Sequence, residues 1–186
     1  MKIIQIGTNK GFDNLTDILN TIPPNNIEFL LFIEPLYFCN ESIKKCYQKF
    51  NFIIENIAIT DNPNEKTITF YTSEKYHRLS SIDKNHILKH KVQTEIIELN
   101  VKCMTISEIF DKYSITQLDI LFVDAESYDH KIIKSIDFDN IKIDTIYYEF
   151  VHGENKYLHE FLENKNYEVT KSDFQDGLTN IAILKK

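Results

Sequence analysis

The chain has little cysteine, little glycine and no tryptophan. Its three cysteines, Cys39, Cys46 and Cys103, are odd in number and contain no Cys-x-x-Cys pair. This argues against a disulfide framework or a zinc centre and favours reduced thiols in a cytosol-like compartment. We therefore predict no metal site.

Long hydrophobic runs and an excess of positive charge are also missing. No apolar run approaches the roughly 20 residues needed to cross a bilayer. The first residues lead directly into a strand-like run rather than a signal peptide, so we expect a cytoplasmic protein without a membrane partner.

A formal net charge of −7 argues against a nucleic-acid partner. With 186 residues, we expect one domain over residues 1–186. The oligomeric state is left open.

Two of the four glycines lie close together, in the stretch IIQIGTNKGFD over residues 3–13. A short apolar run leads into Gly7-x-x-x-Gly11, and a helix-like segment follows. Backbone N–H groups at such a junction can bind a carboxylate or phosphate, although an ordinary turn between a strand and a helix has the same pattern. We expect a bulky residue at Gly7 to abolish ligand binding and to leave the fold largely intact.

Apolar runs alternate with helix-like segments along the chain. Nearly continuous runs over 28–34, 51–61, 118–124 and 145–150 predict buried strands of a parallel sheet. The alternating runs 66–72 and 95–103 predict a pair of half-buried strands. Helical patterns cover 14–19, 36–51, 105–113, 129–135 and 158–164. Only eight residues separate the last two strands, 167–171 and 180–184, so they should form an antiparallel hairpin. The predicted fold is α/β: a Rossmann-like, seven-stranded, mostly parallel sheet with an antiparallel C-terminal edge hairpin and helices on both faces.

Acidic side chains close several of these strands. Ligands of open parallel sheets bind beyond the carboxyl ends of the strands. Glu34 closes the second strand, where it could accept both hydroxyls of an adenosine ribose or could be an ordinary solvated carboxylate. A dinucleotide-binding loop would carry a glycine at the position of Asn9, to let the pyrophosphate approach. S-Adenosylmethionine (SAM) has no pyrophosphate, so the loop favours SAM over the alternative of a nucleotide-dependent oxidoreductase.

The sequence resembles the FkbM-like SAM-dependent methyltransferases. The matching stretches cover most of residues 3–150: IQIGTNKGFDNLT, LLFIEPLYFCNESI, FIIENIAITDNPNEKTITFY, VKCMTISEIFDKYSITQLDILFVDAESYDHKIIKSID and IDTIYYEF. The family's D-x-E-G pattern reads Asp124-Ala125-Glu126-Ser127 here, with serine in place of the glycine. The resemblance implies transfer of a methyl group to a hydroxyl of a small molecule or glycan.

The resemblance also implies the residues that contact the cofactor. Gly7, Thr8, Asn9 and Gly11 would hold the methionine moiety. Glu34 would hold the ribose, Asn56, Ile57 and Ala58 would border the adenine, and Asp124 would lie near the amino group.

A hydroxyl acceptor calls for a general base at the strand ends. The candidates are Asp124, Glu126, Glu149 and His152, of which Glu126 and His152 are favoured because Asp124 would be occupied with the cofactor. Each could instead be a solvated or salt-bridged strand-end residue. A non-catalytic methyltransferase-fold domain that acts as a scaffold is the alternative function.

Residues 73–93 form a basic, histidine-rich segment in an otherwise acidic chain. This composition is typical of a solvated, mobile loop, and the functional alternative is a lid or acceptor-binding loop for an anionic or sugar substrate. His86 and His90 have the spacing of a helical metal pair, but no third ligand is evident nearby.

Overall fold

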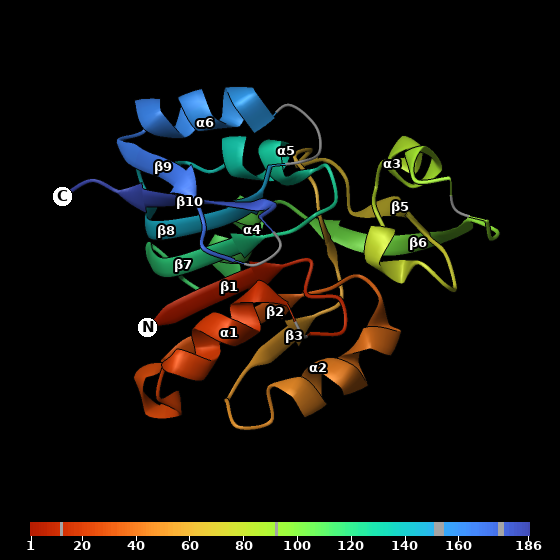
Figure 1. The fold of residues 1–186 in the computed structure, drawn as a ribbon, viewed down its shortest axis with the longest axis horizontal. Helices are drawn as coiled ribbons and strands as arrows, with labels where there is room; N and C mark the ends of the chain where they lie inside the picture. Colours follow the sequence, from red (N-terminus) through yellow and green to blue (C-terminus); the bar gives the residue numbers. More distant parts are fainter. Residues whose placement is uncertain (12, 92, 151–154, 175–176) are drawn as a thin grey trace.

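The computed structural model describes residues 1–11, 13–91, 93–150, 155–174 and 177–186. Its main element is a seven-stranded sheet in the order β3-β2-β1-β7-β8-β10-β9 (Figure 1). These strands are β1 (Lys2–Ile6), β2 (Phe29–Ile33), β3 (Ile53–Glu55), β7 (Gln117–Val123), β8 (Lys142–Glu149), β9 (Tyr167–Lys171) and β10 (Thr179–Leu184). The first five run parallel, and β10 runs antiparallel to both β8 and β9. The predicted fold class is confirmed.

Strand β1 lies inside the sheet, next to the central strand β7, and it is buried on both faces. Ile4 pairs with Leu31 on one side and with Leu121 on the other, and all three side chains are fully buried. The strand order reverses direction between β1 and β7, so the first and fourth parallel strands of the chain lie side by side. The carboxyl ends of β1, β2 and β7 therefore meet at one edge of the sheet.

Helices cover both faces of the sheet. One face carries α4 (Ile106–Lys112), α5 (Asp129–Lys134) and α6 (Asn155–Asn164), and the other carries α1 (Asn14–Thr21) and α2 (Asn40–Cys46). Thr105 caps α4: its hydroxyl accepts from the Glu108 N–H, and the Glu108 carboxylate accepts from the Thr105 N–H. Amphipathic patterning thus produces two separate apolar cores, one on each side of the sheet.

A smaller sheet projects beside the main one and consists of β4 (Ala58–Ile59), β6 (Ile97–Met104) and β5 (Thr67–Thr72) (Figure 1). Strands β5 and β6 pair antiparallel, as their alternating patterns predict. The prediction of one strand over 51–61 is wrong. The run divides into β3 and β4, which belong to different sheets. The division falls at Asn56, whose side chain donates to the carbonyl of Glu34 at 2.8 Å.

The helix predicted over 36–51 is shorter than expected. A 3₁₀ turn, η2 (Tyr37–Cys39), precedes α2, which ends at Cys46. Tyr47 then turns into the core, where its ring lies 4.4 Å from that of Phe32. The other short helices are η1 (Pro24–Asn26), η3 (His77–Leu79) and α3 (Lys84–Lys89). Within the described part of the chain, every helix is too short or too polar to cross a membrane.

Candidate functional site

The glycine loop crosses directly over the end of β7. Gly7 has a φ of 81°, and its N–H donates to the carbonyl of Ile33 at 2.9 Å. A Cβ at this position would lie 1.8 Å from the carbonyl oxygen of Asp124, which is a backbone atom that cannot move away. Gly7 is therefore required by the fold itself, and the expectation that a bulky residue would leave the fold intact is wrong.

Glu34 lies behind the glycine loop with only 4% of its surface exposed. Its carboxylate accepts hydrogen bonds from the backbone N–H groups of Asn9, at 2.5 Å, and Leu36, at 2.9 Å. Burial raises the pKa of Glu34 to about 7, and the two hydrogen bonds only partly offset that rise. The carboxylate thus holds the loop in place, and Glu34 and the loop line the same cavity.

Asn9 joins three parts of the site. It adopts the left-handed conformation, with a φ of 49°, which asparagine tolerates better than most residues. Its N–H binds Glu34, and its side-chain amide donates to the carbonyl of His77 at 3.2 Å. The loop is thereby tied both to β2 and to the basic segment.

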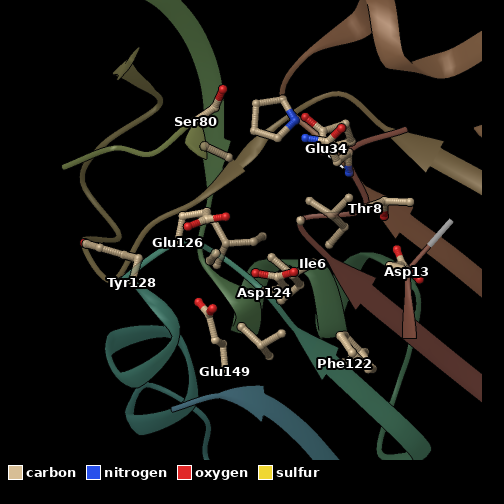
Figure 2. Close-up of a pocket in the computed structure, with 18 of the residues that line it drawn as sticks. Ile6, Thr8, Asp13, Glu34, Ser80, Phe122, Asp124, Glu126, Tyr128 and Glu149 are labelled. Atoms are coloured by element: carbon tan, nitrogen blue, oxygen red, sulfur yellow. Dashed lines mark hydrogen bonds between the residues drawn. The ribbon is translucent and has the colours of Figure 1, made fainter. Parts of the chain in front are cut away.

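Acidic side chains gather at the ends of β7 and β8. Figure 2 shows the carboxylate of Asp124 between Glu126 and Asp13, with Glu149 nearby. The pKa of Asp124 is raised well above its usual value, first by burial and then by the negative charges of Glu126, Asp129, Glu149 and Asp13. Such a cluster favours a ligand that brings positive charge.

These elements enclose a cavity of about 390 Å³, within the range of small-molecule sites. The cavity brings together most of the residues predicted from the sequence: Gly7, Thr8, Asn9, Gly11, Glu34, Ile57, Ala58, Asp124 and Glu126. Asn56 does not line the cavity. Its side chain donates a hydrogen bond to the carbonyl of Glu34, as described above. His152 lies outside the described residues.

The comparisons with known proteins agree with this geometry. Residues 5–169 match the family described as the methyltransferase FkbM domain. The chain belongs to the FkbM methyltransferase family. No curated protein matches the sequence.

Two solved structures show the same fold as this FkbM domain. One is the methyltransferase FkbM from Methylobacillus flagellatus KT, with 12% sequence identity and a TM-score of 0.59 over 98% of this chain. The other is the CurJ carbon methyltransferase, with 7% identity and a TM-score of 0.51 over 100% of this chain. This chain spans 43% and 49% of the lengths of those two chains.

The FkbM domain departs from its family pattern at a strained turn. Glu126 and Ser127 have φ values of 46° and 80°, and both lie in the left-handed region. The glycine that the family pattern places at residue 127 would adopt this conformation without strain, whereas serine does so at a cost. The turn directs Glu126 into the cavity, so its geometry is retained despite the substitution.

A buried histidine of the basic segment contacts the cavity residue Glu126. Nε2 of His86 lies 2.8 Å from Oε2 of Glu126, and the side chains are 3% and 18% exposed. The hydroxyl of Ser81 also donates to the carbonyl of Glu126 at 2.8 Å. The segment therefore contacts the residues after β7 through Ser81 and His86, while much of the rest of it is exposed to solvent.

Other residues of the basic segment reach the cavity. His77, Arg78, Ser80 and Ile82 contribute to its lining, which agrees with a role as a binding loop. The rings of His86 and His90 are 4.8 Å apart. Across the described residues, no group of three or more His, Cys, Asp or Glu side chains is arranged to hold a metal ion.

Two buried polar side-chain atoms lie on and beside β1, and one of them, the Thr8 hydroxyl, faces the cavity. Among the described residues, the hydroxyl of Thr8 and the side-chain oxygen of Gln5 have no hydrogen-bond partner. Thr8 is 1% exposed and lines the cavity beside the glycine loop. Buried polar groups are almost always paired, so a ligand group in the cavity would satisfy the Thr8 hydroxyl.

Sequence reasoning missed Asp13 as a cavity residue. Its carboxylate caps α1 by accepting from the N–H groups of Leu15 and Thr16, and it also accepts from the Gln5 amide at 2.6 Å. Burial raises its pKa. An aspartate directly before a helix is a recognised cap signal, and that signal was available in the sequence. Its position on the cavity wall depends on how α1 packs.

Proposed function

We propose that this chain is a SAM-dependent methyltransferase that methylates a hydroxyl group of a small molecule or glycan. The observation that carries the proposal is the cavity at the ends of β1, β2 and β7. There a glycine loop, a buried Glu34 and an acidic cluster around Asp124 face one space. Membership of the FkbM family supports the reaction class.

The residues present fit the cofactor. The loop Gly7, Thr8, Asn9 and Gly11 would hold the methionine moiety, Glu34 the ribose hydroxyls and Asp124 the amino group, while Ile57 and Ala58 would border the adenine. Asn56 would act indirectly, through the backbone of Glu34. SAM supplies an electrophilic methyl group on a sulfonium centre when it is bound.

Charge favours SAM over a dinucleotide. The cavity walls carry the carboxylates of Asp13, Glu34, Asp124, Glu126 and Glu149. A sulfonium and an ammonium group would gain from these charges, and binding them would favour the ionised form of Glu34 and Asp124. A pyrophosphate would be repelled by the same groups, which argues against the oxidoreductase alternative.

The chain's contribution to catalysis would be orientation and proton removal. Holding the acceptor oxygen in line with the methyl group supplies most of the rate enhancement in such reactions. Glu126 is our proposed general base, because its carboxylate lines the cavity and lies 2.8 Å from Nε2 of His86. His152 remains a second prediction for this role.

The test is calorimetric titration of the purified chain with S-adenosylhomocysteine, the product of methyl transfer. We expect micromolar binding. Glu34→Ala should weaken it by about 1–3 kcal/mol, the scale of lost hydrogen bonds to a charged group. The matched control is Glu28→Ala, since Glu28 is 70% exposed at the other end of β2, and it should bind normally. Absence of binding at millimolar concentration would contradict the proposal and favour the non-catalytic scaffold.

A further inference from the structure

Three basic side chains lie where the glycine loop meets η3, two of them on the wall of the cavity, in contrast to its acidic interior. His77 and Arg78 line the cavity from η3, and Lys10 follows Asn9 in the glycine loop. The hydrogen bond from the Asn9 amide to the His77 carbonyl joins the two segments. We name Lys10, His77 and Arg78 the cationic rim.

The positive charges of the cationic rim are close enough to act on one another. The pKa of His77 is lowered first by burial and then by the positive charges of Lys10 and Arg78. Within the described part of the chain, neither Lys10 nor Arg78 forms an ion pair with an acidic side chain. A protein with a net charge of −7 thus keeps two cations at this place without an acidic partner.

Exposed aromatic rings adjoin the cationic rim. Phe38 is 49% exposed, and its ring meets that of His77 edge to face, with centroids 6.1 Å apart. Tyr37 is 75% exposed and lies against Phe38 at 6.3 Å. These rings belong to η2, which begins directly after the cavity residues Glu34 and Pro35. Aromatic faces of this kind can pack against the apolar face of a flat ring.

We propose that the acceptor carries an anionic group, a phosphate or a carboxylate, which the cationic rim binds while Phe38 packs against the ring that bears it. This proposal rests on the proposed methyltransferase function. Arg78 suits both anions because its planar guanidinium can donate two parallel hydrogen bonds to either of them.

The opposite charges of the rim and the interior would orient such an acceptor. The carboxylates of Glu126 and Asp124 repel an anion, so the anionic group stays at the rim. A neutral hydroxyl on the same molecule faces no such repulsion and can approach Glu126. Recognition at the cationic rim would therefore select which hydroxyl reaches the proposed base.

The experiment compares three probes with the same ring: glucose 6-phosphate, glucuronate and glucose. Each is titrated into the full chain saturated with S-adenosylhomocysteine, and also into the chain alone, and binding is followed by calorimetry or NMR. We expect both charged probes to bind about tenfold more tightly than glucose, the effect of one good charged contact. A preference for only one of them identifies the anion as phosphate or carboxylate.

Variants then assign the effect to residues. Arg78→Gln should remove most of the tenfold preference, and Phe38→Ser should weaken all three probes alike. Lys185→Gln is the matched control, because it removes one exposed positive charge after β10, at the edge of the main sheet opposite the cavity, and it should change nothing.

Two results would overturn the proposal: equal binding of glucose and the charged probes, or an Arg78→Gln variant that loses affinity for S-adenosylhomocysteine but not for the probes. The second result would assign Arg78 to the cofactor carboxylate. If the charged probes bind selectively and S-adenosylhomocysteine does not bind at all, the anion site stands and the methyltransferase proposal fails.

Discussion

The imidazole of His86 and the carboxylate of Glu126 are 2.8 Å apart, Nε2 to Oε2, although 40 positions separate them in the chain. His86 belongs to α3 beside the small sheet, and Glu126 follows β7 of the main sheet. The contact joins the small sheet to the proposed catalytic carboxylate. It places one oxygen of Glu126, the group that we propose as the base, beside the imidazole of His86.

A double-mutant cycle on this pair should show energetic coupling. We expect His86→Ala and Glu126→Gln to lower the free energy of unfolding, and the double variant to lose about 1–2 kcal/mol less than the sum of the two. The measurement is urea denaturation of all four proteins at one pH. Additive losses would show that the contact contributes nothing to stability.

The stability of the ligand-free chain should fall as the pH rises from about 4.5 to 7. Glu34 has an ordinary pKa of 4.5 when unfolded and a pKa of about 7 when folded. The folded state therefore binds more protons across this interval, which makes the slope of unfolding free energy against pH negative. Glu34 alone contributes a change of about 3 kcal/mol at most. Asp129, whose pKa is also raised to about 7, acts in the same direction.

Glu34→Gln tests this pH dependence, because glutamine cannot titrate. The variant loses one acceptor for a backbone N–H, so we expect a roughly constant loss of about 1 kcal/mol at every pH. Its stability should then decline less steeply than that of the wild type between pH 4.5 and 7. Urea denaturation at several pH values provides the comparison, and parallel curves would disprove the raised pKa of Glu34.

Ser127→Gly should stabilise the protein by about 0.5–1 kcal/mol. The serine has a φ of 80°, a conformation that glycine adopts without strain, although glycine also loses more entropy on folding. Ser135→Gly is the control: Ser135 has a φ of −82°, so glycine relieves no strain there and should destabilise. Thermal unfolding of both variants measures the difference. A melting temperature for Ser127→Gly below that of the wild type would contradict the prediction.

Gly7→Ala should destabilise the fold far more than Gly177→Ala. Both glycines have a positive φ, at 81° and 61°. A Cβ at Gly7 meets the backbone of Asp124 at 1.8 Å, whereas a Cβ at Gly177 meets nothing within 4 Å. We expect a loss of about 1 kcal/mol at Gly177, from strain alone, and a loss above about 3 kcal/mol or failure to fold at Gly7. Similar unfolding free energies for the two variants would refute the close approach.

Local signals in the sequence determined the main sheet. The apolar runs ending at Ile33 and Val123, and the short separation of the last two strands, predict parallel strands and a closing hairpin because these patterns depend on burial and chain length alone. The glycine loop and Glu34 were located for the same reason, since each follows directly from the end of a strand. The break at Asn56 was missed because it depends on a side-chain hydrogen bond to the carbonyl of Glu34, which directly follows another strand, β2.

The chain's own pattern thus determined a Rossmann-like sheet, a glycine loop and an acid at the end of β2, because periodicity and strand ends are properties of neighbouring residues. Tertiary structure alone decided that Gly7 crosses over Asp124, that His86 binds Glu126 and that the cationic rim adjoins the cavity. These contacts join residues far apart in the chain. The first arises because β1 and β7 are neighbours in the main sheet, and the other two arise from the way the small sheet packs beside it. No local pattern of residues encodes either arrangement.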